Sequence, residues 1–224
     1  MKTNPLQASL HTILLSVIFC SLLSAQNQNW YFGFNAGLSF NSTTPTPLTN
    51  GQLNSYEGCA VISNSKGNLL FYSDGQQVWN RNHSIMFNGT GLHGHVSTTQ
   101  GALIVPDPGD TNKYYLFTLD QLGSGNGLKY SIVDMSLQSG NGAVTSKNTI
   151  VHFNVTEKLS AIQRCDGNIW IIYHIWQSNT FVSRLLTASG IGPAVNSSVG
   201  ISHIGGGSGY KNSIGFLKNR EYRK

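Results

Sequence analysis

The chain has 224 residues, of which 39% are apolar, enough for one sizeable core. Only 10% are charged, against about 25% in an ordinary soluble domain. Lys2 contributes +1 and residues 218–224 contribute +3 to the net charge of +5, so the rest of the chain carries only +1. A nearly neutral body has no strongly basic face, which excludes nucleic acid and anionic membranes as expected partners.

Residues 1–25 have the pattern of a signal peptide. Lys2 supplies the positive start, residues 13–23 (ILLSVIFCSLL) form the apolar run, and Ala25 precedes a cleavage site at Gln26. Cys20 follows the bulky Phe19, which argues against a lipoprotein site. The run is shorter than the roughly 20 residues that span a bilayer, although an uncleaved anchor is the alternative. We therefore expect a secreted or outer-surface protein without membrane insertion after cleavage.

The rest of the chain predicts β-structure. Short runs rich in Tyr, Phe, Trp, Val and Ile recur between Gly, Asn, Asp and Ser turns, as strands do. Residues 156–163 are the best helical candidate, but this stretch is too short. The predicted strands form three groups: residues 29–34, 59–63, 68–73 and 76–80; residues 101–106, 113–119, 127–134 and 148–153; and residues 159–164, 168–174, 180–186 and a weaker run near 199–204.

The three groups resemble one another. Turns at residues 65–68, 109–112 and 165–168 fall at matching points, about 45 to 55 residues apart, which is the length of a four-stranded propeller blade. The all-β chain is therefore predicted to form a partial β-propeller of about four antiparallel four-stranded blades over residues 26–217, with a β-sandwich as the alternative. Residues 212–218 would begin a further blade, and we interpret the basic tail 218–224 as a truncation point.

Cys59 and Cys165 remain after cleavage of the leader. In an oxidising compartment they could form a disulfide, or they could be two separate buried thiols.

Three polar residues have matching places before the first strand of a group. Glu57, Gln100 and Glu157 precede the runs CAVI, ALIV and LSAI, and these positions ring one mouth of the channel in a propeller. We expect a polar ligand or ion at this ring. Catalysis of glycoside hydrolysis by Glu57 and Glu157 is the alternative, because that chemistry needs two flanking carboxylates. Trp176, near a strand end, is a candidate for stacking on a sugar.

Other chemical motifs are weak, so no catalytic residue, metal or cofactor is predicted. Residues 89–94 (GTGLHG) match a dinucleotide fingerprint in letters, but a strand follows where a helix is needed. His93 and His95 lack the third ligand of a zinc site. The aspartates are expected to cap turns; these are Asp74, Asp107, Asp110, Asp120, Asp134 and Asp166.

Four stretches carry a resemblance to a known family. They are NWYFGFNAGLSFNS, LTNGQLNSYEGCAVISNSKGNLLFYSDGQQVWNRNHSIMFNGTGL, GLKYSIVDMSL and EKLSAI, and the likeness extends over residues 29–217. They resemble the N-terminal region of large secreted Bacteroidetes proteins. These carry a WD-repeat-like propeller, then PKD or other immunoglobulin-like modules, and a gliding-motility-associated type IX sorting domain. Here NREYRK stands in place of the expected continuation into further blades, and the 224 residues contain no stretch that resembles a PKD-like module or a sorting domain.

The resemblance implies a surface-displayed or released binding protein and supplies no catalytic residues. The expected function is therefore an exported, non-enzymatic interaction or adhesion module whose partner is a polysaccharide or another surface protein. A polysaccharide-active enzyme and a structural spacer are the alternatives.

Overall fold

The computed structural model describes residues 28–123, 125–202 and 214–218. The leader and residues 219–224 of the basic tail lie outside this part. The described residues form strands, loops and two short 3₁₀ turns, at Gln121–Gly123 and Gln138–Gly140, and contain no α-helix. The strands are β1 (Asn29–Phe32), β2 (Ala36–Ser39), β3 (Thr46–Leu48), β4 (Ala60–Ser63), β5 (Leu69–Ser73), β6 (Gln77–Asn80), β7 (Ile85–Thr90), β8 (Ala102–Asp107), β9 (Asp110–Leu119), β10 (Leu128–Asp134), β11 (Ala143–His152), β12 (Val155–Gln163), β13 (Ile169–Ile175), β14 (Thr180–Thr187) and β15 (Gly190–Ser198).

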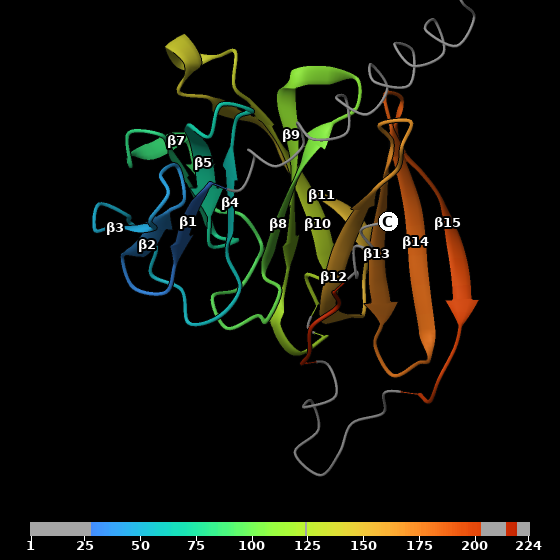
Figure 1. The fold of residues 1–224 in the computed structure, drawn as a ribbon. Helices are drawn as coiled ribbons and strands as arrows, with labels where there is room; N and C mark the ends of the chain where they lie inside the picture. The colour runs from blue at the N-terminus through green and yellow to red at the C-terminus, as the bar shows by residue number, and fades with distance from the viewer. Residues whose placement is uncertain (1–27, 124, 203–213, 219–224) are drawn as a thin grey trace, which may run out of the picture.

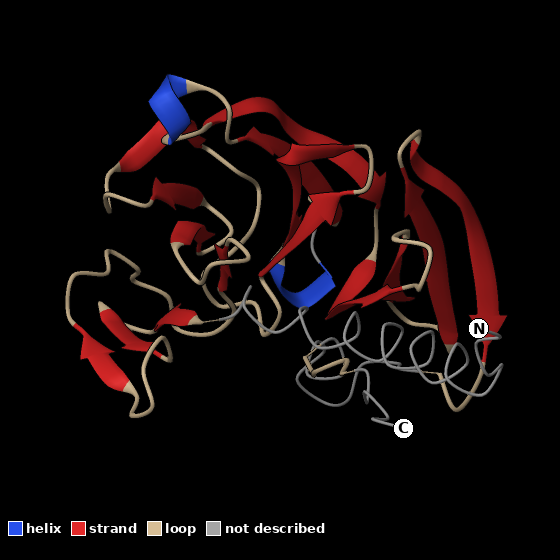
Figure 2. Cartoon of the chain, turned by 45° about the horizontal axis from the view of Figure 1, so that its top comes forward, coloured by secondary structure: helices blue, strands red, loops and turns tan. Residues whose placement is uncertain are grey.

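The strands pair in chain order. Three sets of four antiparallel strands are β4–β7 (blade 1), β8–β11 (blade 2) and β12–β15 (blade 3), and β1–β3 form a three-stranded sheet, the first sheet. One parallel pair, Phe87 with Ala143, joins the outer strands of blades 1 and 2 into an eight-stranded sheet. The first strands β1, β4, β8 and β12 contact one another in this order, and the sheets fan out from them in an arc (Figures 1 and 2). This is the arrangement of a partial propeller.

Each sheet packs on the next through its own core. Alternate side chains of a strand face opposite sides, so the two faces of blade 2 serve two different cores. The core between blades 1 and 2 contains Ile62, Leu70, Phe71, Val78, Met86, Leu92, Ala102, Tyr114, Leu116, Val133, Met135 and Val144. The core between blades 2 and 3 contains Val105, Tyr115, Phe117, Leu119, Leu128, Val155, Leu159, Ile169, Ile171, Tyr173, Val182 and Leu186. The smaller core under the first sheet contains Tyr31, Leu53, Tyr72 and Trp79.

The three matching turns connect the first and second strands of the three blades. In blade 1 the N–H of Gly67 donates to the carbonyl of Asn64 (2.9 Å), and in blade 3 the N–H of Gly167 donates to that of Arg164 (3.1 Å). Both glycines have a positive φ, +79° and +85°, which costs little without a Cβ. Blade 2 has a shorter hairpin at residues 107–110, so the repeat holds in position but not in turn type.

Several strands differ from the predicted ones. Of the predicted run 29–34, residues 29–32 form β1 of the separate first sheet. The strands β2, β3 and β7 were not predicted, because Gly, Pro and Asn interrupt their apolar pattern. The last strand of blade 3 lies at Gly190–Ser198 rather than near 199–204. Its sequence GIGPAVNSS is mostly exposed on the sheet edge. Because neither face of this strand is buried, its sequence does not alternate between apolar and polar residues.

Candidate functional site

Glu157 lies inside β12, not before it as the sequence suggested. The register of β12 against β13 shifts between Val155 and Leu159, and the side chain of Glu157 is fully buried at this irregularity. Its Oε2 accepts hydrogen bonds from the N–H and the hydroxyl of Thr99, both at 2.9 Å, and its Oε1 accepts one from the N–H of Leu122 at 2.9 Å. The carboxylate therefore ties blade 3 to two loops of blade 2.

Glu57 lies shortly before β4, as predicted, and is exposed. Its Oε2 is 3.4 Å from the hydroxyl of Thr99, and its Oε1 is 3.4 Å from the hydroxyl of Ser97. The structure thus brings the two glutamates to one side chain, although one hydroxyl proton can bond only one carboxylate at a time. Because the distance to Glu157 is shorter, Thr99 bonds mainly Glu157, and Glu57 keeps its acceptor capacity for other donors.

Gln100 lies before β8, and its amide bonds backbone groups of two other segments. Its Oε1 accepts from the N–H of Leu159 (3.0 Å) and of Leu217 (2.7 Å), and its Nε2 donates to the carbonyl of Leu217 (3.2 Å). The side-chain amide of Gln100, the third predicted member of the ring, is therefore bonded to residues 214–218 of the same chain.

Trp176 follows β13 and is half-buried. A Cβ built on Gly123 would lie 2.9 Å from Trp176 Cδ1, so the indole packs on the 3₁₀ turn whose Leu122 bonds Glu157. The backbone N–H of Trp176 donates to the carbonyl of Asn154 at 2.8 Å. Three of the four predicted residues thus lie around the segments of Thr99 and Leu122; these are Glu57, Glu157 and Trp176. Thr99 and Leu122 were not predicted as site residues, because neither belongs to a motif.

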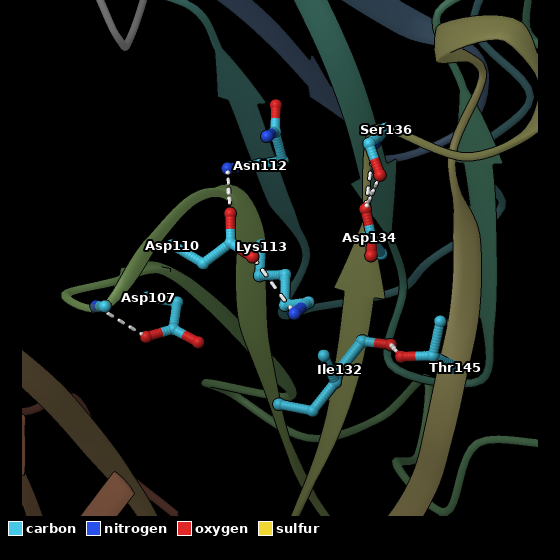
Figure 3. Close-up of polar contacts among 9 residues, drawn as sticks. Asp107, Asp110, Asn112, Lys113, Ile132, Asp134, Ser136 and Thr145 are labelled. Atoms are coloured by element: carbon cyan, nitrogen blue, oxygen red, sulfur yellow. Dashed lines mark hydrogen bonds and ion pairs between the residues drawn. The ribbon is translucent and has the colours of Figure 1, made fainter. Parts of the chain in front are cut away.

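The aspartates hold turns, as predicted. In Figure 3 the carboxylates of Asp107, Asp110 and Asp134 accept N–H bonds from residues two positions further along the chain, at 2.8 to 3.0 Å. Lys113 forms an ion pair with Asp110 (3.0 Å), which raises the pKa of Lys113. The pKa of Asp110 is lowered by the hydrogen bond from the N–H of Asn112 and then by its contact with Lys113. The carboxylates of Asp74, Asp120 and Asp166 likewise accept N–H bonds from nearby residues.

The disulfide between Cys59 and Cys165 is not formed, since both are free thiols. They belong to blades 1 and 3, which blade 2 separates. The Cys59 thiol donates to the carbonyl of Tyr31 (3.3 Å), and burial, together with the charge of Asp74, raises its pKa to about 11. Cys165 is exposed in the β12–β13 turn, so the expectation of two buried thiols is also wrong.

The first sheet exposes an aromatic surface that the sequence analysis missed. Trp30 is 49% exposed and Phe32 is 40% exposed on the outer face of β1, and the ring of Phe40 packs 4.9 Å from that of Trp30. We call these three residues the aromatic face. Phe34 and Tyr56, 59% and 73% exposed, form a second ring pair at 5.4 Å. The alternation in NWYF was the available signal, because it places Trp30 and Phe32 on one face.

Residues 28–56 contain no Asp, Glu, Lys, Arg or His. The first sheet itself is therefore built from amides, hydroxyls and apolar groups, and its own residues offer hydrogen bonds without charge.

Over the described ranges, no three His, Cys, Asp or Glu side chains gather in a way that could hold a metal ion. None of the helical segments in this part of the chain has the length and apolar character to cross a bilayer.

Comparisons of the chain with protein-family models, with curated proteins and with solved structures each gave no match.

Proposed function

We propose that this protein is an exported interaction module that binds a neutral polysaccharide through the aromatic face and catalyses no reaction. The observation that carries the proposal is the exposure of Trp30 and Phe32 side by side on an uncharged sheet. Exposed apolar patches of this kind mark interaction sites in soluble proteins.

The chemistry of the face favours a sugar chain over a charged partner. Flat aromatic rings offer large contact areas at a small cost in side-chain entropy. The hydroxyl of Ser42 donates to the carbonyl of Thr44, and its oxygen can accept a hydrogen bond from a sugar hydroxyl. Without charge on residues 28–56, electrostatic complementarity to an acidic or basic partner is missing.

The positions of the acids support a non-catalytic role. Glycoside hydrolysis needs two carboxylates that both reach the scissile bond. Glu157 is fully buried and its oxygens accept three hydrogen bonds from the protein, so Glu57 is the exposed member of the pair and lacks an accessible second glutamate. All six aspartates accept N–H bonds from nearby residues in turns.

Export is inferred from the leader pattern of residues 1–25 and from the resemblance to large secreted Bacteroidetes proteins. A surface-displayed or released module agrees with the low charge and with the repeat architecture of the chain.

The test is retention on a panel of insoluble polysaccharides such as cellulose, chitin and xylan. We expect the protein to be retained on at least one of them and the double variant Trp30→Ala/Phe32→Ala to lose retention about tenfold or more, because each ring contributes stacking area. A matched control is Phe87→Ala/Phe153→Ala, since these rings are also exposed but lie on β7 and after β11. Equal loss of retention in both double variants contradicts binding through the aromatic face. Release of soluble sugar indicates an enzyme, and absence of retention indicates a spacer.

A further inference from the structure

Residues 214–218 lie against β12 and the start of β8, far from them in the sequence. The amide of Gln100 forms two hydrogen bonds with the backbone of one residue: its Oε1 accepts from the N–H of Leu217 (2.7 Å), and its Nε2 donates to the Leu217 carbonyl (3.2 Å). This is the exchange that two residues make across neighbouring strands, with a side-chain amide in place of one peptide group. The same Oε1 accepts the N–H of Leu159, which fixes the amide on β12.

A second contact holds the other end of the segment. The ammonium of Lys158 donates to the carbonyl of Ile214 at 3.2 Å, and burial lowers the pKa of Lys158. Gly215 lies on the Lys158 side chain, where a Cβ would come within 2.7 Å of Cε, and its φ is +152°. Residue 215 is therefore suited to glycine, because other residues rarely adopt this backbone conformation and because a side chain here would displace Lys158.

Gln100 and Lys158 bind backbone groups of residues 214–218 rather than their side chains. The groups bound are the carbonyl of Ile214 and both backbone groups of Leu217, whereas Ile214 and Phe216 are 46% and 66% exposed. Recognition of this kind accepts many sequences, provided that the segment is extended and has glycine directly after the residue bound by Lys158. It is the mode by which proteins bind peptides as added strands.

We propose that Gln100 and Lys158 form a binding site for an extended, glycine-containing peptide segment, which residues 214–218 occupy in the structure. When this segment leaves, an equivalent segment of another chain takes its place. The site lies at the junction of blades 2 and 3 and shares no residue with the aromatic face, so the two proposals can fail separately.

A labelled peptide with the sequence of residues 212–218, NSIGFLK, tests the site by fluorescence anisotropy on three full-length proteins. In the unaltered chain the internal segment competes. Leu217→Pro removes the N–H that bonds Gln100 and so vacates the site. We expect the Leu217→Pro protein to bind the peptide at least about tenfold more tightly than the unaltered chain. The double variant Leu217→Pro/Gln100→Ala is expected to lose this gain. Equal peptide binding by all three proteins, or none by Leu217→Pro, overturns the proposal.

Two controls separate recognition from damage to the fold. A peptide that carries Gly215→Val should not bind the Leu217→Pro protein, since a side chain there meets Lys158; binding as tight as that of NSIGFLK contradicts the assignment. Gln100→Glu keeps the acceptor for Leu159 and Leu217 but loses the donor to the Leu217 carbonyl. We expect faster hydrogen exchange of the Leu217 amide in Gln100→Ala than in Gln100→Glu, with unchanged circular dichroism for Gln100→Glu. Equal exchange in these two variants also overturns the proposal.

Discussion

The first sheet and the three blades are attached to their neighbours by different physical means. Blades 1, 2 and 3 stack through two large cores of mostly aliphatic and phenyl side chains. The first sheet rests on blade 1 through a small cluster in which Tyr31 stacks on Tyr72 (4.9 Å between ring centroids) and Tyr72 on Trp79 (5.5 Å). Aromatic pairs of this geometry contribute beyond their buried area, but here they also bring polar groups into the interface.

These polar groups form a chain of hydrogen bonds that runs through a histidine. The hydroxyl of Tyr31 donates to Oδ1 of Asn50 (3.0 Å), and Nδ2 of Asn50 lies 2.8 Å from Nε2 of His83. Nδ1 of His83 lies 3.1 Å from the hydroxyl of Tyr72, which also accepts the N–H of Gln52 (3.1 Å). Because an amide nitrogen only donates, Nε2 of His83 must be unprotonated in this arrangement.

The difference means that the two cores between the blades depend mainly on apolar burial, whereas the attachment of the first sheet also depends on the protonation of a histidine. Apolar burial is insensitive to pH, whereas a partly buried hydrogen-bond chain fails when one of its members changes from acceptor to donor. We therefore expect the two regions to respond differently to mutation and to acid.

The largest effect is expected for Phe117→Ala. This ring is fully buried between blades 2 and 3, and its removal leaves a cavity that should lower the free energy of unfolding by about 3–5 kcal/mol. Urea denaturation measures the loss, and Phe87→Ala, at a ring that is 65% exposed, should stay within about 0.5 kcal/mol. A small loss for Phe117→Ala would contradict a tightly packed core between these blades.

A smaller effect separates the two glutamates. Glu157→Gln replaces an acceptor oxygen by an NH₂ group that faces the N–H of Thr99 or Leu122, and the unpaired donor should cost about 1.5–3 kcal/mol. Glu57→Gln, at an exposed carboxylate with two long contacts, should change stability by less than about 0.5 kcal/mol. Urea denaturation gives both changes in the free energy of unfolding from the shift of the midpoint, provided that the dependence on urea concentration is the same in all proteins. Equal losses would show that the two acids act as one unit.

Acid should loosen the first sheet before the blades. Burial lowers the pKa of His83 below the value of about 6.5 for an unfolded chain. The stabilisation by neutral His83 is then fully present above pH 6.5 and is lost as the pH falls through the lowered folded pKa. Hydrogen exchange of the Gln52 amide, corrected for its intrinsic pH dependence, should lose protection over this range, while amides in the core between blades 1 and 2 keep theirs.

His83→Gln should remove this pH dependence, because its amide does not titrate there. His93→Gln alters a histidine in the loop between β7 and β8 and should leave it unchanged. A pH profile that is the same in all three proteins would assign the acid response to other groups.

The smallest effect is a gain within a blade core. The Thr118 hydroxyl is fully buried, and its Oγ1 has no hydrogen-bond partner among the described residues. Thr118→Val keeps the shape and removes the unpaired hydroxyl, so the free energy of unfolding should rise by about 1 kcal/mol. Calorimetric melting measures this change, and a loss of stability would reveal a hidden partner of the hydroxyl.

The sequence predicted the β-class, three recurring groups of strands and the turn aspartates because these features are local, but it assigned residues 29–34 to the first group and missed β7. A turn such as Asp74-Gly75 or residues 165–168 carries its own conformational requirement, and strand alternation follows from which side of one strand is buried. The order of the blades then followed from the repeat, since consecutive strands pair with their neighbours.

Only the tertiary structure decided what the candidate residues do. Glu57, Gln100 and Glu157 looked equivalent because each lies near the first strand of a blade. Their roles differ because a register shift in β12 turns Glu157 inward, while residues 214–218 come to lie on Gln100. Burial and contacts between distant segments of the chain are stabilised by many weak interactions together, so no short sequence motif predicts them. The sequence alone therefore determined the repeating unit, and the packing of those units determined which polar groups stay accessible.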